Sequence, residues 1–489
     1  MSFGRAFAAL TGASAVSMVA HVLRGKVAAL FLGPAGVGIF NQLSLAWNIA
    51  QTIGGLGSFN GLIQHGAEAL GNDDQAGLRR LASTFTLLLG AVSLAIALSG
   101  AVFAAPLSNW LLRDGGRHAP LVALMMLACP IGVSAQLWRA LLSAGQQVRA
   151  LVHAQIASDV IGAVVFAALV VWLGLTGAVI GFLSTQLLLF LVQAWYVRRR
   201  LGHGLLRPRL HRFNWRIVRA NIGFGASGLL LIVAFNLAVI LVSQILIARF
   251  GAEANGYFAN AWRIASVYLG AVTTTTIGYF LPGLARSEDD AAMGREVNQT
   301  LRFYLTILPP LMAGIIATGE WIVWLILSKA FFPVAMLLPL LVPAELARIA
   351  TDMILAQYMA RRRLGPFTVT YIAQFGALVG LAWLLIPQYG AWGAALAYLL
   401  AMTGSVVLAL VLAAIHFRFV LDRATVRLAL AALVALAGTV ALFFAFPIGL
   451  ARLALITALG AVWAALVLRE DGPRKLLGYG LVRLRTVGR

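Results

Sequence analysis

The sequence has little charge and almost no cysteine. Only 11% of its 489 residues are Asp, Glu, Lys or Arg, whereas 61% are hydrophobic, and the mean hydropathy is +0.91. A soluble protein of this size carries much more charge on its surface, so this composition excludes a soluble fold and indicates an all-α polytopic membrane protein. Cys129 is the single cysteine, which excludes an intramolecular disulfide and a paired-cysteine metal or redox site.

Signatures of catalysis are also missing from the sequence. It contains no G-x4-G-K-[ST] phosphate loop, no recurring metal-ligand spacing and no His/Asp/Ser grouping. We therefore expect no nucleotide hydrolysis, no cofactor and no bound metal. The loops between apolar runs are short, which argues against a membrane-embedded glycan polymerase or ligase. The sequence predicts a transporter rather than an enzyme.

Apolar runs long enough to cross a bilayer, at roughly 20 residues each, recur along the whole chain. The first run has no cleavage site and contains buried basic residues, so we interpret it as a retained helix rather than a signal peptide. About fourteen transmembrane helices are predicted, near 6–32, 36–63, 81–104, 119–145, 152–173, 177–197, 222–248, 254–284, 299–319, 335–360, 366–387, 391–415, 428–446 and 450–468.

Basic residues are distributed unequally between the two sides of the predicted membrane. With the N-terminus inside, 27 of the 37 Lys and Arg residues fall in inside segments and five fall in outside loops. The positive-inside rule then predicts a membrane protein with both termini in the cytoplasm. The net charge of +21 is accordingly a topology signal and an attraction to the anionic inner leaflet, and does not indicate nucleic-acid binding.

Two glycine turns indicate an internal duplication. Residues 33–40 and 251–258 both read G-x4-G-x-F, at an offset of 218 residues. A second pair of turns, at Gly174 and Gly390, has an offset of 216. Glycine recurs in tight helix hairpins for conformational reasons alone, but the agreement of two offsets favours a repeat of six spans. Because six is even, the halves should be related by an axis along the membrane normal.

The duplication predicts the organisation of the chain into two six-helix lobes and an appendage. The expected parts are an N-terminal lobe at 1–200, a basic cytoplasmic linker at 201–220, a C-terminal lobe at 221–418, and two additional helices with a basic cytoplasmic tail at 419–489. Bundles paired in this way usually bind substrate near the midplane and expose it to each side in turn.

Cations inside the predicted spans form the first group of candidate site residues. A central Arg or Lys costs roughly 2.5–3.5 kcal/mol to insert, so each needs a counter-charge, a wet cavity or an anionic substrate. Arg24 and His21 share a face of the first span, whereas Lys26 points elsewhere and lies close enough to its end to reach the outer interface. Arg263 lies in the eighth span, and the sequence shows no evident partner for it or for Arg24. We predict a cationic cavity built on these residues, with Lys26 in either a binding or a structural role.

Acidic residues inside the spans form the second group. Asp159 in the fifth span is a natural ion-pair partner for Arg139 in the fourth. Glu345, Arg348 and Asp352 lie three and four residues apart on one stripe of the tenth span. Either these ions neutralise one another and serve the structure, or a buried carboxylate couples transport to a proton.

Two polar residues of the second span, Asn41 and Gln42, complete the candidate set. Together with His21 they are predicted to line a wet path through the lobes. Hydrogen-bonded packing between membrane helices explains such residues equally well, so both interpretations stay open.

Several motifs together resemble a known family. They are the basic residue seven positions before Gly33, the stretch from Gly55 to Glu68, the stretch from Tyr279 to Arg286, the Glu345/Arg348 pattern and the turn from Pro387 to Gly393. Over residues 5–418 the chain is similar to Wzx-type oligosaccharide-lipid flippases of O-antigen and enterobacterial common antigen synthesis. These form the polysaccharide transport family of the MOP exporter superfamily.

The resemblance implies a V-shaped fold like that of MATE exporters and MurJ, with a central cationic cavity. It implies flipping of an undecaprenyl-pyrophosphate-linked oligosaccharide to the outer leaflet, in a pathway that includes polymerase and chain-length proteins. Lys26 matches a basic residue of the family and Arg263 looks like the span-eight cation of lipid II flippases, so we expect both, with Arg24 and Arg139, to contact pyrophosphate. Asp159 matches no family acid.

A multidrug exporter of the MATE type has the same predicted architecture and is the main alternative. Such exporters expel organic cations and need buried acids in the cavity, whereas the first span here presents bases. A lipid scramblase would also account for buried cations. The glycan, the coupling ion and the oligomeric state have no signature in the sequence.

Overall fold

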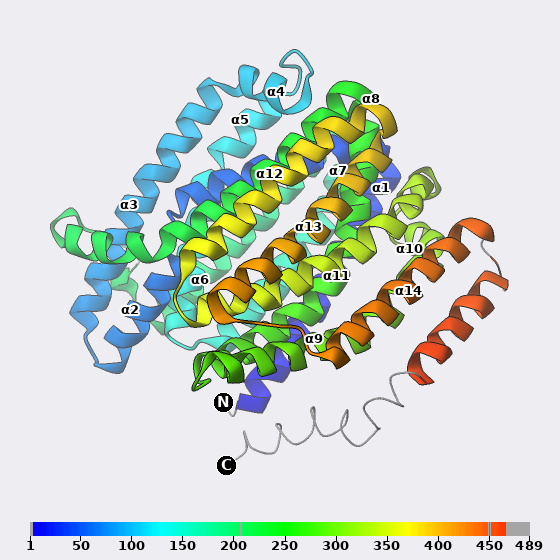
Figure 1. The fold of residues 1–489 in the computed structure, drawn as a ribbon. Helices are drawn as coiled ribbons and strands as arrows, with labels where there is room; N and C mark the ends of the chain where they lie inside the picture. Colours follow the sequence, from blue (N-terminus) through cyan, green and yellow to red (C-terminus); the bar gives the residue numbers. More distant parts are fainter. Residues whose placement is uncertain (1–2, 206–207, 448, 450, 466–489) are drawn as a thin grey trace. The chain divides into compact units, whose positions relative to one another are not determined.

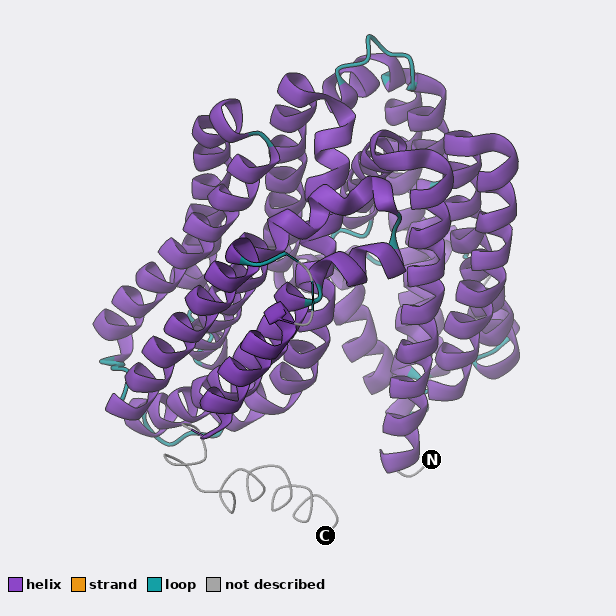
Figure 2. Ribbon diagram, turned by 90° about the vertical axis from the view of Figure 1, so that its right-hand side faces the viewer, coloured by secondary structure: helices purple, strands orange, loops and turns teal. Residues whose placement is uncertain are grey.

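The computed structural model describes residues 3–205, 208–447, 449 and 451–465. Every regular element in this part of the chain is helical, joined by short loops, as Figures 1 and 2 show. The fold is therefore all-α, as predicted. The elements in chain order are α1 (Phe3–Gly54), α2 (Phe59–Gly71), α3 (Gln75–Val102), α4 (Ala104–Leu112), α5 (Ala119–Leu127), α6 (Cys129–Ala144), α7 (Val148–Arg200), η1 (His203–Leu205), η2 (Leu210–Arg212), α8 (Trp215–Ala285), α9 (Asp290–Ala317), α10 (Gly319–Ile326), η3 (Lys329–Phe331), α11 (Phe332–Ala360), α12 (Leu364–Tyr389), α13 (Ala391–Phe417) and α14 (Arg423–Ala445).

Three helices are too long to cross a membrane once. α1, α7 and α8 contain 52, 53 and 71 residues, and each is broken by one non-helical glycine, at Gly33, Gly174 and Gly251 respectively. Ten helices of the described chain are long and apolar enough to cross a membrane, and a shorter apolar helix covers Ala451–Ala465. When each of the three broken helices supplies two spans, the structure accounts for the fourteen that the sequence predicts.

The turns of the proposed duplication have matching backbone conformations. Gly174 and Gly390 both have φ of 56°, and Gly33 and Gly251 have φ of 64° and 81°. Glycine adopts this left-handed region without the steric penalty that a Cβ imposes. Three residues beyond Gly174 and Gly390, a Cβ at Gly177 or Gly393 would overlap the carbonyl oxygen eight residues earlier in its own hairpin. The repeat seen in the sequence is thus also a repeat of hairpin geometry.

The other pair of repeated turns makes a reciprocal contact. A Cβ at Gly38 would overlap the carbonyl oxygen of Ala252, and a Cβ at Gly256 would overlap that of Pro34. Asn255, which is fully buried, donates from Nδ2 to the Gly38 carbonyl oxygen at 3.1 Å. The two backbones can approach this closely because neither turn carries a side chain at its glycine.

The chain forms two compact units, each made of non-contiguous segments. The first comprises Met1–Ala259, Leu325–Phe331 and Phe375–Ala394, and the second comprises Asn260–Trp324, Phe332–Gln374 and Ala395–Arg489. The core of the first unit surrounds buried aromatic residues such as Trp47 and Phe85. The lobe boundaries expected from the duplication stay a prediction.

The basic linker expected at 201–220 is docked along part of its length. Thr84 of α3 donates to the Arg212 carbonyl oxygen at 3.4 Å and accepts from the Asn214 backbone N–H at 3.1 Å. Leu205 is buried at 2% exposure. The described part of the linker is therefore anchored to the first unit by side-chain and backbone contacts.

The expected C-terminal appendage is present in the second unit as α14 and the helix Ala451–Ala465, and α14 packs against α9. Arg452, which the sequence places in an outside loop, is buried. Its guanidinium pairs with Glu320, donates to the Ala317 carbonyl oxygen at 3.0 Å and lies 4.7 Å from the centre of the Phe443 ring. These contacts tie the appendage to the α9–α10 region. The basic tail expected at 466–489 lies outside the described residues.

The loop between α4 and α5 is closed around one carboxylate. Asp114 accepts hydrogen bonds from Ser108 Oγ and from the backbone N–H groups of Gly116 and His118, and its Oδ2 lies 2.7 Å from His118 Nδ1. Burial opposes the charged form of Asp114, but the hydrogen bonds outweigh it and lower the pKa of the carboxyl below its ordinary value.

Candidate functional site

Arg24 and Asp159 form an ion pair between two long helices of the first unit. Arg24 Nη2 donates to Asp159 Oδ1 at 2.9 Å, and the two side chains are 12% and 4% exposed. α1 supplies the cation and α7 the carboxylate, because these two helices pack together. An ion pair so far from water persists only when each charge has a partner, so the packing of the first unit depends on both residues.

Asp159 has a different partner from the one that the sequence suggested. The expected pairing was with Arg139, yet both carboxylate oxygens of Asp159 are engaged by Arg24 and by Gln155, whose Nε2 donates at 2.7 Å. Arg139 is exposed on α6. Arg24 and Asp159 are 135 residues apart, and only the packing of α1 on α7 brings them together.

The guanidinium of Arg24 is only partly satisfied. Its Nη1 has one long contact, 3.5 Å to Thr185 Oγ1, and its Nε has no hydrogen-bond partner among the residues that the structure describes. A guanidinium carries five N–H donors arranged to meet planar or tetrahedral anions at two points. Arg24 therefore keeps donors available while it is paired to Asp159.

The other polar residues of α1 lie in different surroundings. His21 is exposed, with Nδ1 2.6 Å from the Ser17 carbonyl oxygen one turn earlier. Lys26 donates from Nζ to the Leu325 carbonyl oxygen at 2.8 Å. This contact supports the structural alternative for Lys26, since a carbonyl oxygen takes up one of its donors.

Asn41 and Gln42 are buried in this conformation, at 6% and 0% exposure. Gln42 Nε2 lies 3.4 Å from the Leu111 carbonyl oxygen and 3.3 Å from that of Ile240, so it links three segments of the first unit. Their position agrees with hydrogen-bonded helix packing. Their predicted role in lining a wet path stays a prediction.

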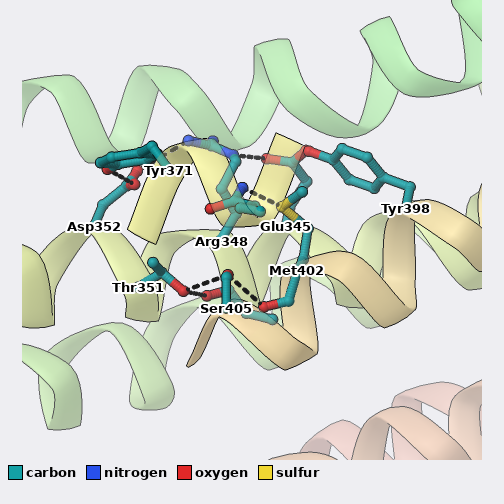
Figure 3. Close-up of polar contacts among 10 residues, drawn as sticks. Glu345, Arg348, Thr351, Asp352, Tyr371, Tyr398, Met402 and Ser405 are labelled. Carbon is teal, nitrogen blue, oxygen red and sulfur yellow. Dashed lines mark hydrogen bonds and ion pairs between the residues drawn. The ribbon is translucent and has the colours of Figure 1, made fainter. Parts of the chain in front are cut away.

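A second ion cluster lies in the second unit (Figure 3). Arg348 donates from Nε to Glu345 at 2.7 Å and from Nη1 to Asp352 at 3.0 Å, all on α11. The three- and four-residue spacing seen in the sequence produces this pairing within one helix. Arg263, the remaining predicted cation, belongs to the same unit and has an exposed side chain.

Two tyrosines complete the second cluster, and the sequence analysis did not select them. Tyr398 of α13 donates its hydroxyl to Glu345 Oε1 at 2.6 Å, and Tyr371 of α12 donates to Asp352 Oδ1 at 2.6 Å. All four carboxylate oxygens therefore have a donor, and Glu345 is fully buried. Tyrosine hydroxyls within apolar spans were the available signal, because a buried tyrosine usually finds a hydrogen-bond partner.

Residues 27–336 match the family described as "Polysaccharide biosynthesis protein". The "Lipid III flippase" of Escherichia coli (strain K12) is 25% identical over 403 residues, which cover 82% of this chain and 95% of that protein. The chain also has the fold of two solved structures. "Lipid II flippase MurJ, inward closed conformation" has a TM-score of 0.73 at 14% identity and covers 95% of this chain and 99% of its own. An inward-facing multidrug resistance MATE family transporter of the MOP superfamily has a TM-score of 0.69 at 15% identity, covering 82% and 94%.

These similarities agree with the resemblance seen in the sequence. The family match extends over more than half of the chain, and the MurJ and MATE structures share its helical architecture. Of the ten described helices long enough to cross a membrane, seven lie wholly or partly in this stretch and three lie beyond it. This multi-pass membrane protein therefore belongs to the polysaccharide biosynthesis protein family.

Proposed function

We propose that this protein is a flippase that moves an undecaprenyl-pyrophosphate-linked oligosaccharide from the cytoplasmic to the periplasmic leaflet, for the synthesis of a surface polysaccharide such as O-antigen. The family match and the similarity to a lipid III flippase support this proposal. The observation that carries it is Arg24, a cation among membrane helices that keeps donors free while paired. Such donors suit the oxygens of a pyrophosphate.

In this proposal the charged residues have different roles. Arg24 is the main pyrophosphate ligand, and Arg263 and Arg139, whose side chains are exposed, supply further positive charge during transport. Lys26 joins them when its contact with Leu325 opens. Glu345, Arg348 and Asp352 serve as a structural ion cluster, because every carboxylate oxygen in it already has a donor.

The membrane potential is the proposed driving force. A pyrophosphate that leaves a negative-inside cell gains roughly 2.3 kcal/mol per charge per 100 mV. This is a secondary transporter and not an enzyme, with alternating access between the two sides. The distribution of basic residues supports an inner-membrane orientation with both termini in the cytoplasm, facing the anionic leaflet. The polymerase and chain-length proteins of the same pathway are the proposed partners.

Export of organic cations is the second candidate function. The MATE fold and the excess of acid over base in the Glu345–Arg348–Asp352 cluster favour it. Arg24 argues against it, since a cation exporter gains nothing from a guanidinium with free donors. The two functions differ in which compound accumulates when the protein is absent.

Deletion of the gene tests the proposed function. We expect glycan-loaded polyprenyl pyrophosphate to accumulate in the inner leaflet, and wild-type protein to reverse this accumulation. Arg24→Ala should fail to reverse it at normal membrane levels. Arg24→Ala/Asp159→Asn, which removes the carboxylate left unpaired, should also fail, whereas Arg80→Ala, at an exposed position on α3, should succeed. Accumulation of a cationic drug without accumulation of the lipid would establish export instead.

A further inference from the structure

The ion pair between Arg24 and Asp159 is asymmetric. Asp159 is 4% exposed and both of its carboxylate oxygens accept short hydrogen bonds, one from Arg24 and one from Gln155. Arg24 is three times as exposed and uses only Nη2 in a short bond. The carboxylate is thus satisfied, whereas the guanidinium has donors that make no short hydrogen bond among the described residues.

Asp159 also has support that does not depend on Arg24. Gln155 lies one turn earlier on α7 and donates at 2.7 Å, so the carboxylate keeps a donor if Arg24 moves away. Thr185, across the hairpin of α7, donates to the Gly181 carbonyl oxygen at 3.1 Å and packs so closely on Gly162 that a Cβ there would overlap it. The residues that contact the Arg24 guanidinium therefore lie on one helix hairpin, whereas Arg24 itself lies on another helix.

Resting on the proposed function, we propose that Asp159 is an internal counter-ion that occupies Arg24 when no substrate is bound and that an anionic lipid headgroup must displace in order to bind. A diphosphate diester carries two negative charges, whereas a phosphodiester headgroup carries one. A singly charged headgroup only replaces the charge that Asp159 already supplies, so it gains little from the exchange. A diphosphate brings a second charge and a second set of oxygens for the unused donors of Arg24.

The need for such a counter-ion is specific to the bilayer. A guanidinium with unused donors in a membrane protein meets phospholipid headgroups at far higher concentration than any glycan lipid. Without a resident counter-ion, these headgroups would compete for Arg24 by mass action. Asp159 lowers the affinity of Arg24 for every anionic headgroup, so a singly charged lipid gains little by displacing it and a diphosphate lipid gains more.

Lipid binding to the purified full-length protein tests this role. The probes are a sugar-linked polyprenyl pyrophosphate, which is a diphosphate diester, and phosphatidylglycerol in a neutral detergent, and the readout is the dissociation constant of each. Wild type should prefer the pyrophosphate lipid. Asp159→Asn keeps the size of the side chain and should bind phosphatidylglycerol about tenfold more tightly or better, on the scale of coupling energies between close charges. Because either lipid displaces Asp159, the pyrophosphate lipid should also bind more tightly, by a similar factor. Asp159→Ser is the second neutral variant should the Asn protein not be recovered, and Asp114→Asn, which removes a carboxylate outside the spans, should change neither constant.

Two further results separate failure of this inference from failure of the proposed function. If Asp159→Asn leaves both dissociation constants unchanged, or weakens the binding of both lipids, Asp159 only positions Arg24 and the counter-ion role is wrong. If Arg24→Ala binds polyprenyl pyrophosphate as tightly as wild type, Arg24 is not the phosphate ligand and the proposed site itself is wrong.

Discussion

Arg24 and Arg348 are both membrane-embedded arginines paired with carboxylates, but their surroundings differ. Arg348 donates short hydrogen bonds from two nitrogens to two carboxylates, and each carboxylate also accepts a hydrogen bond from a tyrosine hydroxyl. Arg24 has one acid and one short bond, and its Nε has no partner in the described part of the chain. Burial of a charge alone therefore does not mark a site. The donors that remain unused after pairing distinguish a residue available to a ligand from one committed to the fold.

The difference has a physical cause in how the partners are supplied. Glu345 and Asp352 are on the same helix as Arg348, one turn to either side, so they follow it wherever α11 goes. Asp159 is on a different helix from Arg24, and a relative shift of α1 and α7 can separate them. A pair that spans two helices can open during transport, whereas a pair within one helix persists.

Removing either arginine should lower the free energy of unfolding, and the loss should be larger for Arg348 than for Arg24. Arg348→Ala leaves the fully buried Glu345 and the half-buried Asp352 without a cation and should lower the free energy of unfolding by about 3–5 kcal/mol. Arg24→Ala leaves one carboxylate, which retains Gln155, so its loss should be smaller and should recover when Asp159→Asn is added. The apparent melting temperature of the protein in detergent measures both. Equal losses, with no recovery in the double variant, would contradict the distinction.

The tyrosines that close the second cluster should matter next. Tyr398→Phe removes a donor to fully buried Glu345 and should cost about 1.5–3 kcal/mol, as for a hydrogen bond to a charged group. Tyr371→Phe should cost less, because Asp352 is 17% exposed. Thr185→Val, at the 3.5 Å contact with Arg24, is the matched change in the first unit. A larger fall in melting temperature for Thr185→Val than for Tyr398→Phe would contradict our conclusion that the Arg348 cluster is fully hydrogen-bonded and Arg24 only partly so.

The smallest expected effect on stability is at Asp114, a carboxylate outside the spans, and this effect depends on pH. The lowered pKa of Asp114 means that its hydrogen bonds stabilise the fold above the unfolded pKa, near 3.9, and that this stabilisation is lost as the pH falls through the folded pKa. Asp114→Asn should therefore lower the free energy of unfolding at pH 7 by about 1 kcal/mol. The melting temperatures of the two proteins should converge below about pH 4. A constant difference between pH 7 and pH 3 would show that the charge of Asp114 is not responsible.

The parts of the fold that depend on neighbouring residues were predictable from the sequence. Glycine at the hairpin turns and the apolar length of each run gave the spans and the repeat. The helical spacing of Glu345, Arg348 and Asp352 gave their ion pairs. In each case the interacting groups lie within a few residues of one another, so a single helix or turn determines the geometry.

The parts that depend on how helices pack were not predictable. The partner of Asp159 was misassigned because the order of helices around the bundle decides which cation faces it. Burial of Gln42 reflects the rotation of α1 about its own axis, which the sequence of one amphipathic segment does not determine. Tyr371 and Tyr398 were missed because apolar spans contain many aromatic residues, and only the tertiary fold selects those that reach an ion.

The contact between the repeated turns bears on the origin of the protein. Gly38 meets Ala252, and Gly256 meets Pro34, so each half presents the same position of its turn to the other. A contact that is unchanged when its two sides are exchanged is the kind formed at the two-fold axis of a homodimer. A half-length ancestor could thus have formed the same interface between two identical chains before gene fusion. Fusion then freed Arg24 and Asp159 to appear in one half without being copied into the other.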